Sequence, residues 1–311
     1  MVPDVTIVMS FKDPGRYFDL ALRSIFAQTL GNWELILIDD GSDDGSLRFA
    51  QSLRDPRVRV FSDGRCRRQQ VRRNEAIALA RAPHIALMDA DDVMHPRRLE
   101  TQFVELERQR RAVVLGSTAF SIDEDNNLLG LRRPRARWRP GNYECRSAFL
   151  NPTVAAPTSW FRANPYSEDP VFYRSEDAEL WCRTSRDTDF VNLEDPLMFY
   201  REQRRINLAN YLGSSMGLCV LLQRKYAKPH YHFVKLWSVE IAKVWIAITA
   251  EAFGVSDILV KRRSQPIGPA ARAEALRILS QIHHVELPLP SSEAISTSGP
   301  SQHLPPEIVR P

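Results

Sequence analysis

The sequence has few cysteines and no arrangement of them that suits a structural metal site. Its 311 residues include four cysteines, and no two of them form a C-x-x-C pair. No histidine stands at zinc-ligand spacing from any of them, so the composition excludes a zinc finger or zinc ribbon. We expect all four cysteines to be reduced thiols.

Targeting and membrane-spanning segments are also missing from the sequence. The first residues enter an apolar run directly, without the basic stretch and hydrophobic core of a signal peptide. A spanning helix needs about 20 mostly apolar residues. The segment at residues 233–248 is shorter than this and carries Lys235 and Lys243 off its apolar stripe. We therefore expect a cytoplasmic protein.

A large excess of charge of one sign is absent as well. The chain has 42 basic and 38 acidic residues, a formal net charge of +4. Nucleic-acid binding calls for a concentrated basic surface, so we expect no nucleic-acid partner. Arginines do gather at residues 65–73 and 132–139. Each cluster either meets phosphates or forms a solvated loop.

No glycine-rich loop follows the first apolar run. That position reads S-F-K-D-P-G at residues 10–15. A nucleotidyltransferase would need a glycine-rich loop there to hold a triphosphate, and a dinucleotide oxidoreductase would need G-x-G-x-x-G. Both enzyme classes are therefore excluded.

The sequence does contain an alternation of strand-like and helix-like segments. Short apolar, β-branched runs predict buried parallel strands, and apolar residues at helical spacing predict the helices between them. The predicted strands cover 5–9, 33–38, 58–61, 84–88 and 113–117, and the predicted helices cover 20–28, 42–53, 71–81 and 96–110. This order predicts an α/β fold with a doubly wound, mostly parallel sheet and a Rossmann-like nucleotide-binding half.

Polar clusters follow three of the predicted strands directly, at residues 10–13, 39–42 and 89–92. Ligands of an open parallel sheet bind beyond the carboxyl ends of its strands, so these clusters should line one crevice. Asp89, Asp91 and Asp92 repel one another unless a cation neutralises them, and carboxylate oxygens suit Mg²⁺ or Mn²⁺. The alternative is a helix N-terminus with solvated charges.

Several motifs occur in a fixed order around these carboxylates. They are V-T-I-V-M-S at 5–10, S-I-F-A-Q-T at 24–29, W-E-L-I-L-I-D-D-G-S-D-D-G at 33–45, Arg73-Asn74, and L-M-D-A-D-D at 87–92. Together they resemble the family 2 glycosyltransferases, inverting enzymes with the GT-A fold, from about residue 5 to residue 201.

The resemblance implies a metal-dependent hexosyltransferase-type activity with Mn²⁺ or Mg²⁺ as cofactor. The donor would be a nucleotide diphosphate sugar, with UDP favoured as the nucleotide. The acceptor would be a hydroxyl of a saccharide or lipid-linked saccharide in surface polysaccharide synthesis. A non-catalytic glycan-binding or assembly module that retains the GT-A fold is the alternative.

The resemblance also implies roles for individual side chains on the donor side. Asp40 would contact the base, Ser10 would lie beside the nucleotide, and Asp89 would contact the ribose. Arg68 and Arg73, from the first arginine cluster, are expected to bind the donor as well.

The predicted metal ligands are Asp91, Asp89 and Asp92. Relatives often carry a further histidine near the metal, two residues after a Tyr-Arg pair. This chain reads Y-R-E-Q at residues 200–203, so the additional ligand is water, Glu202 or Gln203.

An acidic pair at Glu176 and Asp177 lies within S-E-D-A-E-L-W-C-R at residues 175–183. By resemblance it is the catalytic pair near the acceptor, with Asp177 as the base that takes the proton of the attacking hydroxyl. The alternative is a helix start, because acidic residues favour the first helical turn.

The sequence predicts three regions along the chain. Residues 1–205 form the catalytic domain, 206–284 a helical extension, and 285–311 a disordered tail rich in Pro, Ser and Thr. The apolar stripe at 233–248 is typical of a helix that packs on the protein's own core. The alternative is peripheral contact with the inner face of a membrane.

Overall fold

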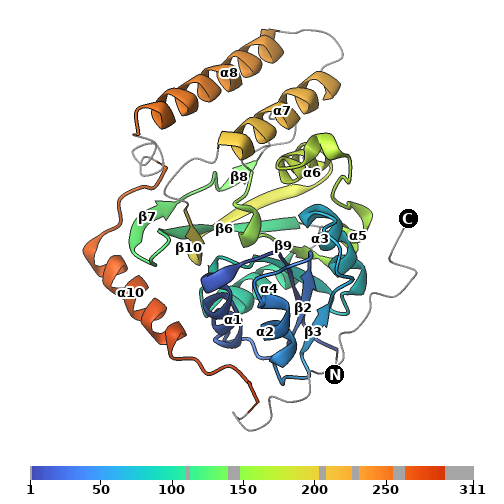
Figure 1. Ribbon diagram of the computed structural model, residues 1–311, viewed down its shortest axis with the longest axis vertical. Coiled ribbons are helices and arrows are strands. Elements are labelled where there is room, and N and C mark those ends of the chain that lie inside the picture. The colour runs from blue at the N-terminus through green and yellow to red at the C-terminus, as the bar shows by residue number, and fades with distance from the viewer. Residues whose placement is uncertain are drawn as a thin grey trace.

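One large sheet with helices on both sides organises the protein (Figure 1). The structure is a computed structural model that describes residues 2–109, 113–138, 148–202, 208–225, 231–254 and 263–290. Eight strands follow the order β3-β2-β1-β4-β9-β6-β10-β5, while β7 pairs with β6 and β8 pairs with β10. The strands are β1 (Val5–Phe11), β2 (Trp33–Asp39), β3 (Val58–Phe61), β4 (His84–Asp89), β5 (Val93–Met94), β6 (Val113–Ile122), β7 (Leu128–Arg132), β8 (Arg137–Trp138), β9 (Ala155–Pro157) and β10 (Asp189–Arg201).

The first half of the sheet is parallel, as the sequence predicts. Strand β1 pairs in parallel with β2 and β4, and β2 pairs in parallel with β3. Every residue of β1 and β2 is buried, because helices cover both faces. Val8 belongs to the same buried cluster as Ile77, whereas its neighbour Met9 packs with Leu22 in the other layer. The doubly wound arrangement is confirmed here.

The second half of the sheet is mixed. Strand β9 runs antiparallel to both β4 and β6, and the long strand β10 runs parallel to β6. The pairing of β10 with β6 shifts register on both sides of Pro196, which has no N–H to donate. The predicted strand at 113–117 extends to Ile122 because β10 accompanies it that far.

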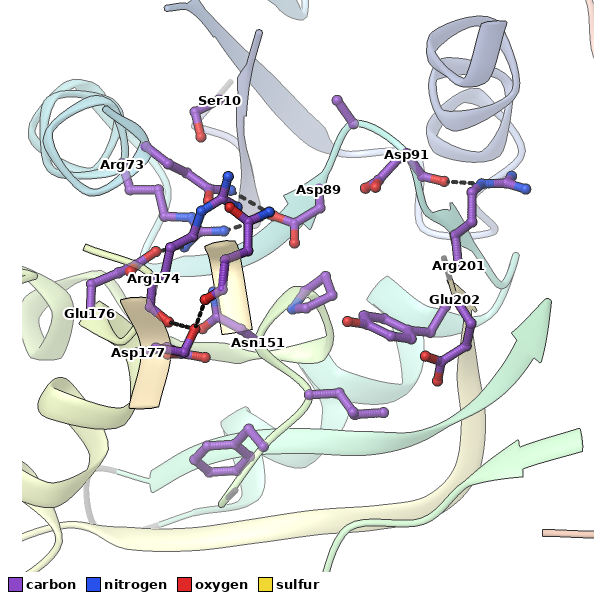
Figure 2. Close-up of a pocket in the computed structure, with 18 of the residues that line it drawn as sticks. Ser10, Arg73, Asp89, Asp91, Asn151, Arg174, Glu176, Asp177, Arg201 and Glu202 are labelled. Atoms are coloured by element: carbon purple, nitrogen blue, oxygen red, sulfur yellow. Dashed lines mark hydrogen bonds and ion pairs between the residues drawn. The ribbon is translucent and has the colours of Figure 1, made fainter. Parts of the chain in front are cut away.

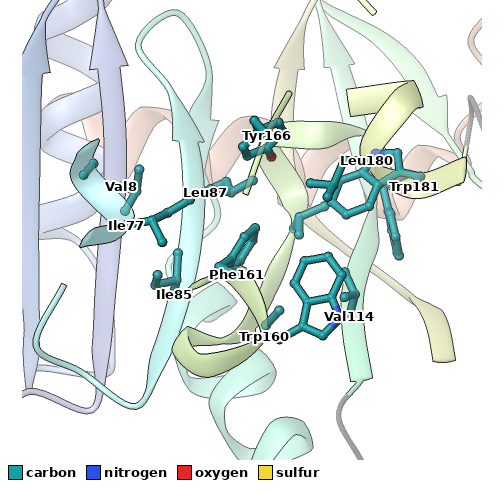
Figure 3. Packing of buried hydrophobic residues seen from close by; sticks show 14 of the residues in the cluster. Val8, Ile77, Ile85, Leu87, Val114, Trp160, Phe161, Tyr166, Leu180 and Trp181 are labelled. Atoms are coloured by element: carbon teal, nitrogen blue, oxygen red, sulfur yellow. The ribbon is translucent and has the colours of Figure 1, made fainter. Parts of the chain in front are cut away.

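Helices cover the sheet in two layers. They are α1 (Phe18–Phe26), α2 (Ser46–Ser52), α3 (Gln69–Leu79), α4 (Arg98–Arg108), α5 (Thr158–Ala163), α6 (Glu176–Thr184), α7 (Leu208–Lys225), α8 (Tyr231–Ala252) and α10 (Pro269–His283). Figure 3 shows one layer, in which Trp160 of α5 and Trp181 of α6 pack near Val114 of β6. The Trp160 and Trp181 rings stack with their centroids 6.2 Å apart. This packing fixes α6, and with it the predicted catalytic pair.

The C-terminal helices contact different parts of the protein. Helix α10 packs on the sheet through Ala275, Ile278, Leu279 and Ile282, in a cluster that includes Phe199 of β10. Helices α7 and α8 pack on each other at the other end of the molecule (Figure 1). The first residues of the predicted tail also contact the catalytic domain, since Arg54 N–H donates to the Pro288 carbonyl at 2.7 Å. Residues 291–311 lie outside the described chain.

The apolar stripe of α8 faces solvent over much of its length. Trp237 is 45% exposed and Trp245 is 65% exposed, and Ile241 is also exposed. The prediction that this stripe packs on the protein's own core is therefore wrong for these three residues. No helix in the described ranges is both long enough and apolar enough to cross a bilayer.

Candidate active site

The three polar clusters predicted at strand ends meet at one edge of the sheet. In the parallel registers, Ser10 of β1 lies beside Asp89 of β4. The N–H of Asp40 donates to the Phe11 carbonyl at 2.8 Å, which extends the contact beyond the strands. Side chains from all three clusters line one cavity of about 1420 Å³. The expectation of one shared crevice is confirmed.

The opposite wall of this cavity comes from segments far along the chain. It is formed by the start of α6 and the first turns of α7. The end of β10 and the loop at 132–135 also line the cavity, and β10 adjoins Asp91 there because Arg201 Nε donates to the Asp91 carbonyl at 2.7 Å. Figure 2 shows Asp89 and Asp91 on one side of the cavity, and Glu176 and Asp177 on the other. The predicted donor-side and acceptor-side acids therefore face the same space.

Asp40 is held by the loop that precedes α3. Its carboxylate accepts hydrogen bonds from the N–H groups of Arg67 at 2.6 Å and Arg68 at 3.1 Å, and from Arg72 Nε at 3.0 Å. Arg72 is fully buried and also pairs with Asp63 and Glu75. One buried cation thus offsets the mutual repulsion of three carboxylates. The contact between Asp40 and the nucleotide base stays a prediction. The hydrogen bonds that Asp40 accepts from the loop before α3 are present in the structure.

Arg73 connects the two acidic clusters. Its Nη2 donates to Asp89 Oδ1 at 2.7 Å, and its Nη1 lies 3.8 Å from Glu176 Oε1 (Figure 2). The guanidinium is buried, so these interactions are screened less by water than a surface pair would be. Arg73, predicted to bind the donor, is therefore also the link between the two walls.

Asn151 and Tyr166 complete the surroundings of Arg73. With its amide oriented to satisfy both neighbours, Asn151 accepts from Arg73 Nη1 at 3.0 Å and donates to the Tyr166 hydroxyl at 3.3 Å. The Arg73 guanidinium also lies over the Tyr166 ring, 5.6 Å from its centroid. Burial raises the pKa of Tyr166, which keeps its hydroxyl neutral. No sequence motif pointed to either residue.

The acidic pair lies in the first turn of α6. Burial and, next, the charge of Glu176 raise the pKa of Asp177 to about 7. Glu176 Oε2 is buried without a hydrogen-bond partner among the described residues. A helix start alone does not require a carboxyl with a pKa near neutrality, whereas a general base does. Asp177 also lines the cavity, and its catalytic role stays a prediction.

Asp91 and Asp92 face in different directions. Asp91 lines the cavity, but Asp92 is only 1% exposed and does not line it. Asp92 Oδ1 accepts from the N–H of Arg201 at 2.7 Å, and Arg201 Nε donates to the Asp91 carbonyl at 2.7 Å. Asp92, predicted as a metal ligand, therefore joins the loop after β4 to the end of β10 behind the cavity. It does not line the cavity with Asp89 and Asp91, and its role as a metal ligand stays a prediction.

Asp89 and Asp91 are the carboxylates that fit a divalent metal at this site. Burial and, next, the charge of Asp89 raise the pKa of Asp91 to about 6, and a cation there would relieve the repulsion. Within the described ranges, no group of three or more Asp, Glu, His or Cys residues is suited to a metal ion. Two carboxylates, with phosphate oxygens and water at the other positions, match the way Mg²⁺ is commonly bound with a nucleotide.

Glu202 is the described candidate for the additional metal ligand. It lines the cavity, and its Oε1 pairs with Arg132 Nη1 at the end of β7. A metal at Glu202 would therefore compete with Arg132. Gln203, the other predicted side-chain ligand, lies outside the described residues.

Arg68 and Arg174 share one aromatic ring at the cavity wall. Their guanidinium carbons lie 4.9 and 5.1 Å from the centroid of the Tyr173 ring. Both arginines have positive φ angles, 78° and 73°, which non-glycine residues rarely adopt. Strained backbone of this kind is concentrated at functional sites. No motif in the sequence pointed to Tyr173 and Arg174, although they directly precede S-E-D at 175–177.

Comparison with known sequences identifies relatives of this chain. The sequence model of glycosyl transferase family 2 matches residues 6–167, more than half of the chain. The putative glycosyltransferase EpsE of Bacillus subtilis (strain 168) is 31% identical over 185 residues, which cover 58% of this chain and 66% of EpsE.

Solved structures share the architecture. S. aureus TarS 1-349 in complex with UDP matches with a TM-score of 0.55 and 12% identity, over 90% of this chain and 80% of that one. Mannosyltransferase PcManGT from Pyrobaculum calidifontis, in complex with GDP-Man and Mn²⁺, matches with a TM-score of 0.52 and 13% identity, over 90% and 81%. At these identities the likeness establishes the GT-A fold alone.

Proposed function

The chain belongs to glycosyl transferase family 2, and from this premise we propose that it is an inverting, metal-dependent transferase. It would move a sugar from a nucleotide diphosphate sugar to a saccharide hydroxyl. The observation that carries the proposal is the placement of Asp177 and Asp91 on two sides of one cavity (Figure 2). Inversion needs a base on the acceptor side of the anomeric carbon and charge stabilisation on the leaving-group side.

Asp177 is the proposed base. It takes the proton of the acceptor hydroxyl as that oxygen attacks the anomeric carbon, and the bond to the donor diphosphate breaks on the opposite face. The pKa of about 7 leaves much of Asp177 ionised at neutral pH while keeping it basic enough to accept a proton. Glu176 raises that pKa, and Arg73 keeps Glu176 in place.

Asp91 and Asp89 are the proposed ligands of Mn²⁺ or Mg²⁺. When bound, the metal supplies positive charge that offsets the negative charge developing on the departing diphosphate. Asp89 is oriented for this by Arg73 and by Gln69, whose Nε2 donates to Asp89 Oδ1 at 3.2 Å. The Mn²⁺ in the PcManGT complex supports a metal in this fold.

The donor half of the cavity has room and free polar groups for a nucleotide. Ser10 Oγ is buried and has no hydrogen-bond partner among the described residues. Asp40 and Arg68 line the same region. The complex of TarS with UDP supports UDP as the nucleotide, and the PcManGT complex makes GDP the comparison to test.

The acceptor is proposed to be a saccharide or lipid-linked saccharide used in surface polysaccharide synthesis, reached from the inner face of a membrane. Exposed large apolar side chains on α7 and α8, including Met216, Trp237 and Trp245, support peripheral contact. Residues 203–263 hold ten Lys and Arg residues against three Asp and Glu residues. This positive segment suits an anionic bilayer surface.

The reaction type is tested by incubating the protein with a soluble saccharide acceptor, Mn²⁺ and either UDP-sugars or GDP-sugars, and following nucleotide release. The anomeric configuration of the first product is read by proton NMR. We expect release of UDP from a UDP-sugar. A donor in which the sugar is α-linked should give a β-linked product. Retention of configuration would rule out the inverting mechanism. Nucleotide binding without any turnover would favour the non-catalytic module.

A further inference from the structure

The cavity is larger than a nucleotide sugar requires. Its volume is about 1420 Å³, whereas pockets for single small ligands usually have roughly 300–1,000 Å³. Residues 10–91 line its donor half, and segments between residues 132 and 265, which include α6 and α7, supply the rest of the lining. The second half therefore has space for a substantial part of the acceptor, and its side chains indicate the acceptor's chemistry.

Two arginines from distant parts of the chain line the cavity on segments that are paired with each other. Leu131 and Gln265 form an antiparallel bridge through backbone hydrogen bonds of 2.9 and 2.8 Å. Arg133 follows Leu131 by two residues, and Arg263 precedes Gln265 by two. Because the segments are antiparallel, both arginines lie beyond the same end of the bridge, and both line the cavity.

Neither arginine is neutralised within the described ranges. Glu202, a carboxylate that also lines the cavity, pairs with Arg132 instead. Arg133 and Arg263 have no ion pair with a described carboxylate, and both are exposed at the cavity. Two like charges held close together without a counterion are unfavourable, and a bound anion removes that repulsion.

The donor diphosphate already has its own cations on the other wall. Lys12, Arg68 and Arg73 line the donor half, next to the proposed metal ligands. Arg133 and Arg263 lie instead on the two segments that the Leu131–Gln265 bridge joins, and these segments line the same cavity as Tyr211 of α7. Their positive charge is therefore additional to that of Lys12, Arg68 and Arg73.

We propose that Arg133 and Arg263 form a subsite for a phosphate or diphosphate group of the acceptor. This inference rests on the proposed function and specifies its acceptor as a phosphate-linked saccharide. The planar guanidinium suits bidentate bonding to phosphate oxygens. Helix α7 lines the cavity with Tyr211 and exposes Leu212 and Met216. An acceptor with an apolar anchor beyond its phosphate would match that arrangement.

The subsite is tested with geranyl diphosphate as the probe, titrated into the full chain saturated with UDP. The test variant is Arg133→Gln with Arg263→Gln, and the control is Arg48→Gln, an exposed arginine of α2 that does not line the cavity. We expect binding by the wild type and the control, and a loss of roughly tenfold or more in the double variant, as charged hydrogen bonds are removed. The affinity for UDP should be unchanged in all three proteins.

Each contrary result has a distinct meaning. Equal binding of geranyl diphosphate by the double variant and the wild type would overturn the subsite. A matching loss of UDP affinity would overturn it too, because the arginines would then serve the donor. Inorganic pyrophosphate that binds as tightly as geranyl diphosphate would point to a free anion and overturn the acceptor assignment. Arginine-dependent geranyl diphosphate binding without any sugar transfer would leave the subsite standing and reject the proposed function.

Discussion

The two walls of the cavity are built in different ways. The donor wall consists of the ends of β1, β2 and β4, whose residues are neighbours through the parallel sheet register. The acceptor wall consists of the start of α6 and the first turns of α7, and the lining is completed by segments that meet through tertiary contacts such as the Leu131–Gln265 bridge. The donor wall is therefore preorganised by the core of the fold, while the acceptor wall can vary without disturbing it. Substrate differences between relatives are expected on the second wall.

Replacing the proposed base should distinguish the contributions of the two walls most clearly, because it should lower turnover without weakening donor binding. Asp177→Asn removes the proton acceptor and is expected to lower kcat by about 10²- to 10⁴-fold. The affinity for UDP should stay within about twofold, because the donor wall is intact. Steady-state kinetics and UDP titration measure the two effects. Asp187→Asn, at an exposed position just after α6, is the control and should retain activity. Full activity of Asp177→Asn would remove the base assignment.

The rigidity of the donor wall depends on the buried cation Arg72. Arg72→Met leaves Asp40, Asp63 and Glu75 without their shared partner, and breaking such a buried network costs about 3–5 kcal/mol. Thermal unfolding should show a clearly lower Tm, and UDP binding should weaken with it. Arg277→Met, in an exposed pair on α10, should leave the Tm unchanged. An unchanged Tm in Arg72→Met would contradict the preorganised donor wall.

The pH profile of turnover reports on the acceptor wall. A base must be deprotonated, so kcat should rise as the pH increases through about 7, the pKa of Asp177. Removing the negative charge in Glu176→Gln lowers that pKa, so the rise should move to lower pH. Rate measurements from pH 5 to 9 would show the shift. A rise that stays in place or moves to higher pH would argue against this coupling.

The exposed apolar face of α8 should affect binding of the protein to a membrane surface rather than its rate of sugar transfer. Trp237→Ser with Trp245→Ser is expected to weaken binding to phosphatidylglycerol vesicles by about tenfold or more, because each buried aromatic side chain contributes about 1.5–3 kcal/mol. Turnover with a water-soluble acceptor should be unchanged. Vesicle sedimentation measures the binding, with Val104→Ser, an exposed apolar position on α4, as the control. Absence of vesicle binding by the wild type would reject the membrane contact.

The same contrast explains how much of the fold is predictable from the sequence. Local apolar runs define β1 to β4, and their polar ends place Ser10 and Asp89 together once the strands are parallel. The mixed half is less predictable, because β9 has three residues and its place depends on both neighbours. The position of α10 was also not predictable from the sequence, because its short apolar face packs on strands that are distant along the chain.

The site was only partly predictable for the same reason, because sequence patterns describe residues that are close together along the chain. A run of acidic residues shows that Asp91 and Asp92 are adjacent, but it does not show that Asp92 turns inward to bond Arg201. The contacts of Asn151 with Arg73 depend on segments that meet only in three dimensions. The exposure of Trp245 likewise follows from how α8 packs on α7, which the helical spacing does not encode.

The central claim is that Asp91 serves the donor with a metal, while Asp177 serves the acceptor. Calorimetric titration of UDP, with and without Mn²⁺, into the wild type, Asp91→Ala and Asp177→Asn tests it most directly. We predict that Mn²⁺ strengthens UDP binding to the wild type and to Asp177→Asn, and that Asp91→Ala loses this metal effect. Equal UDP binding with and without Mn²⁺ in all three proteins would contradict the account.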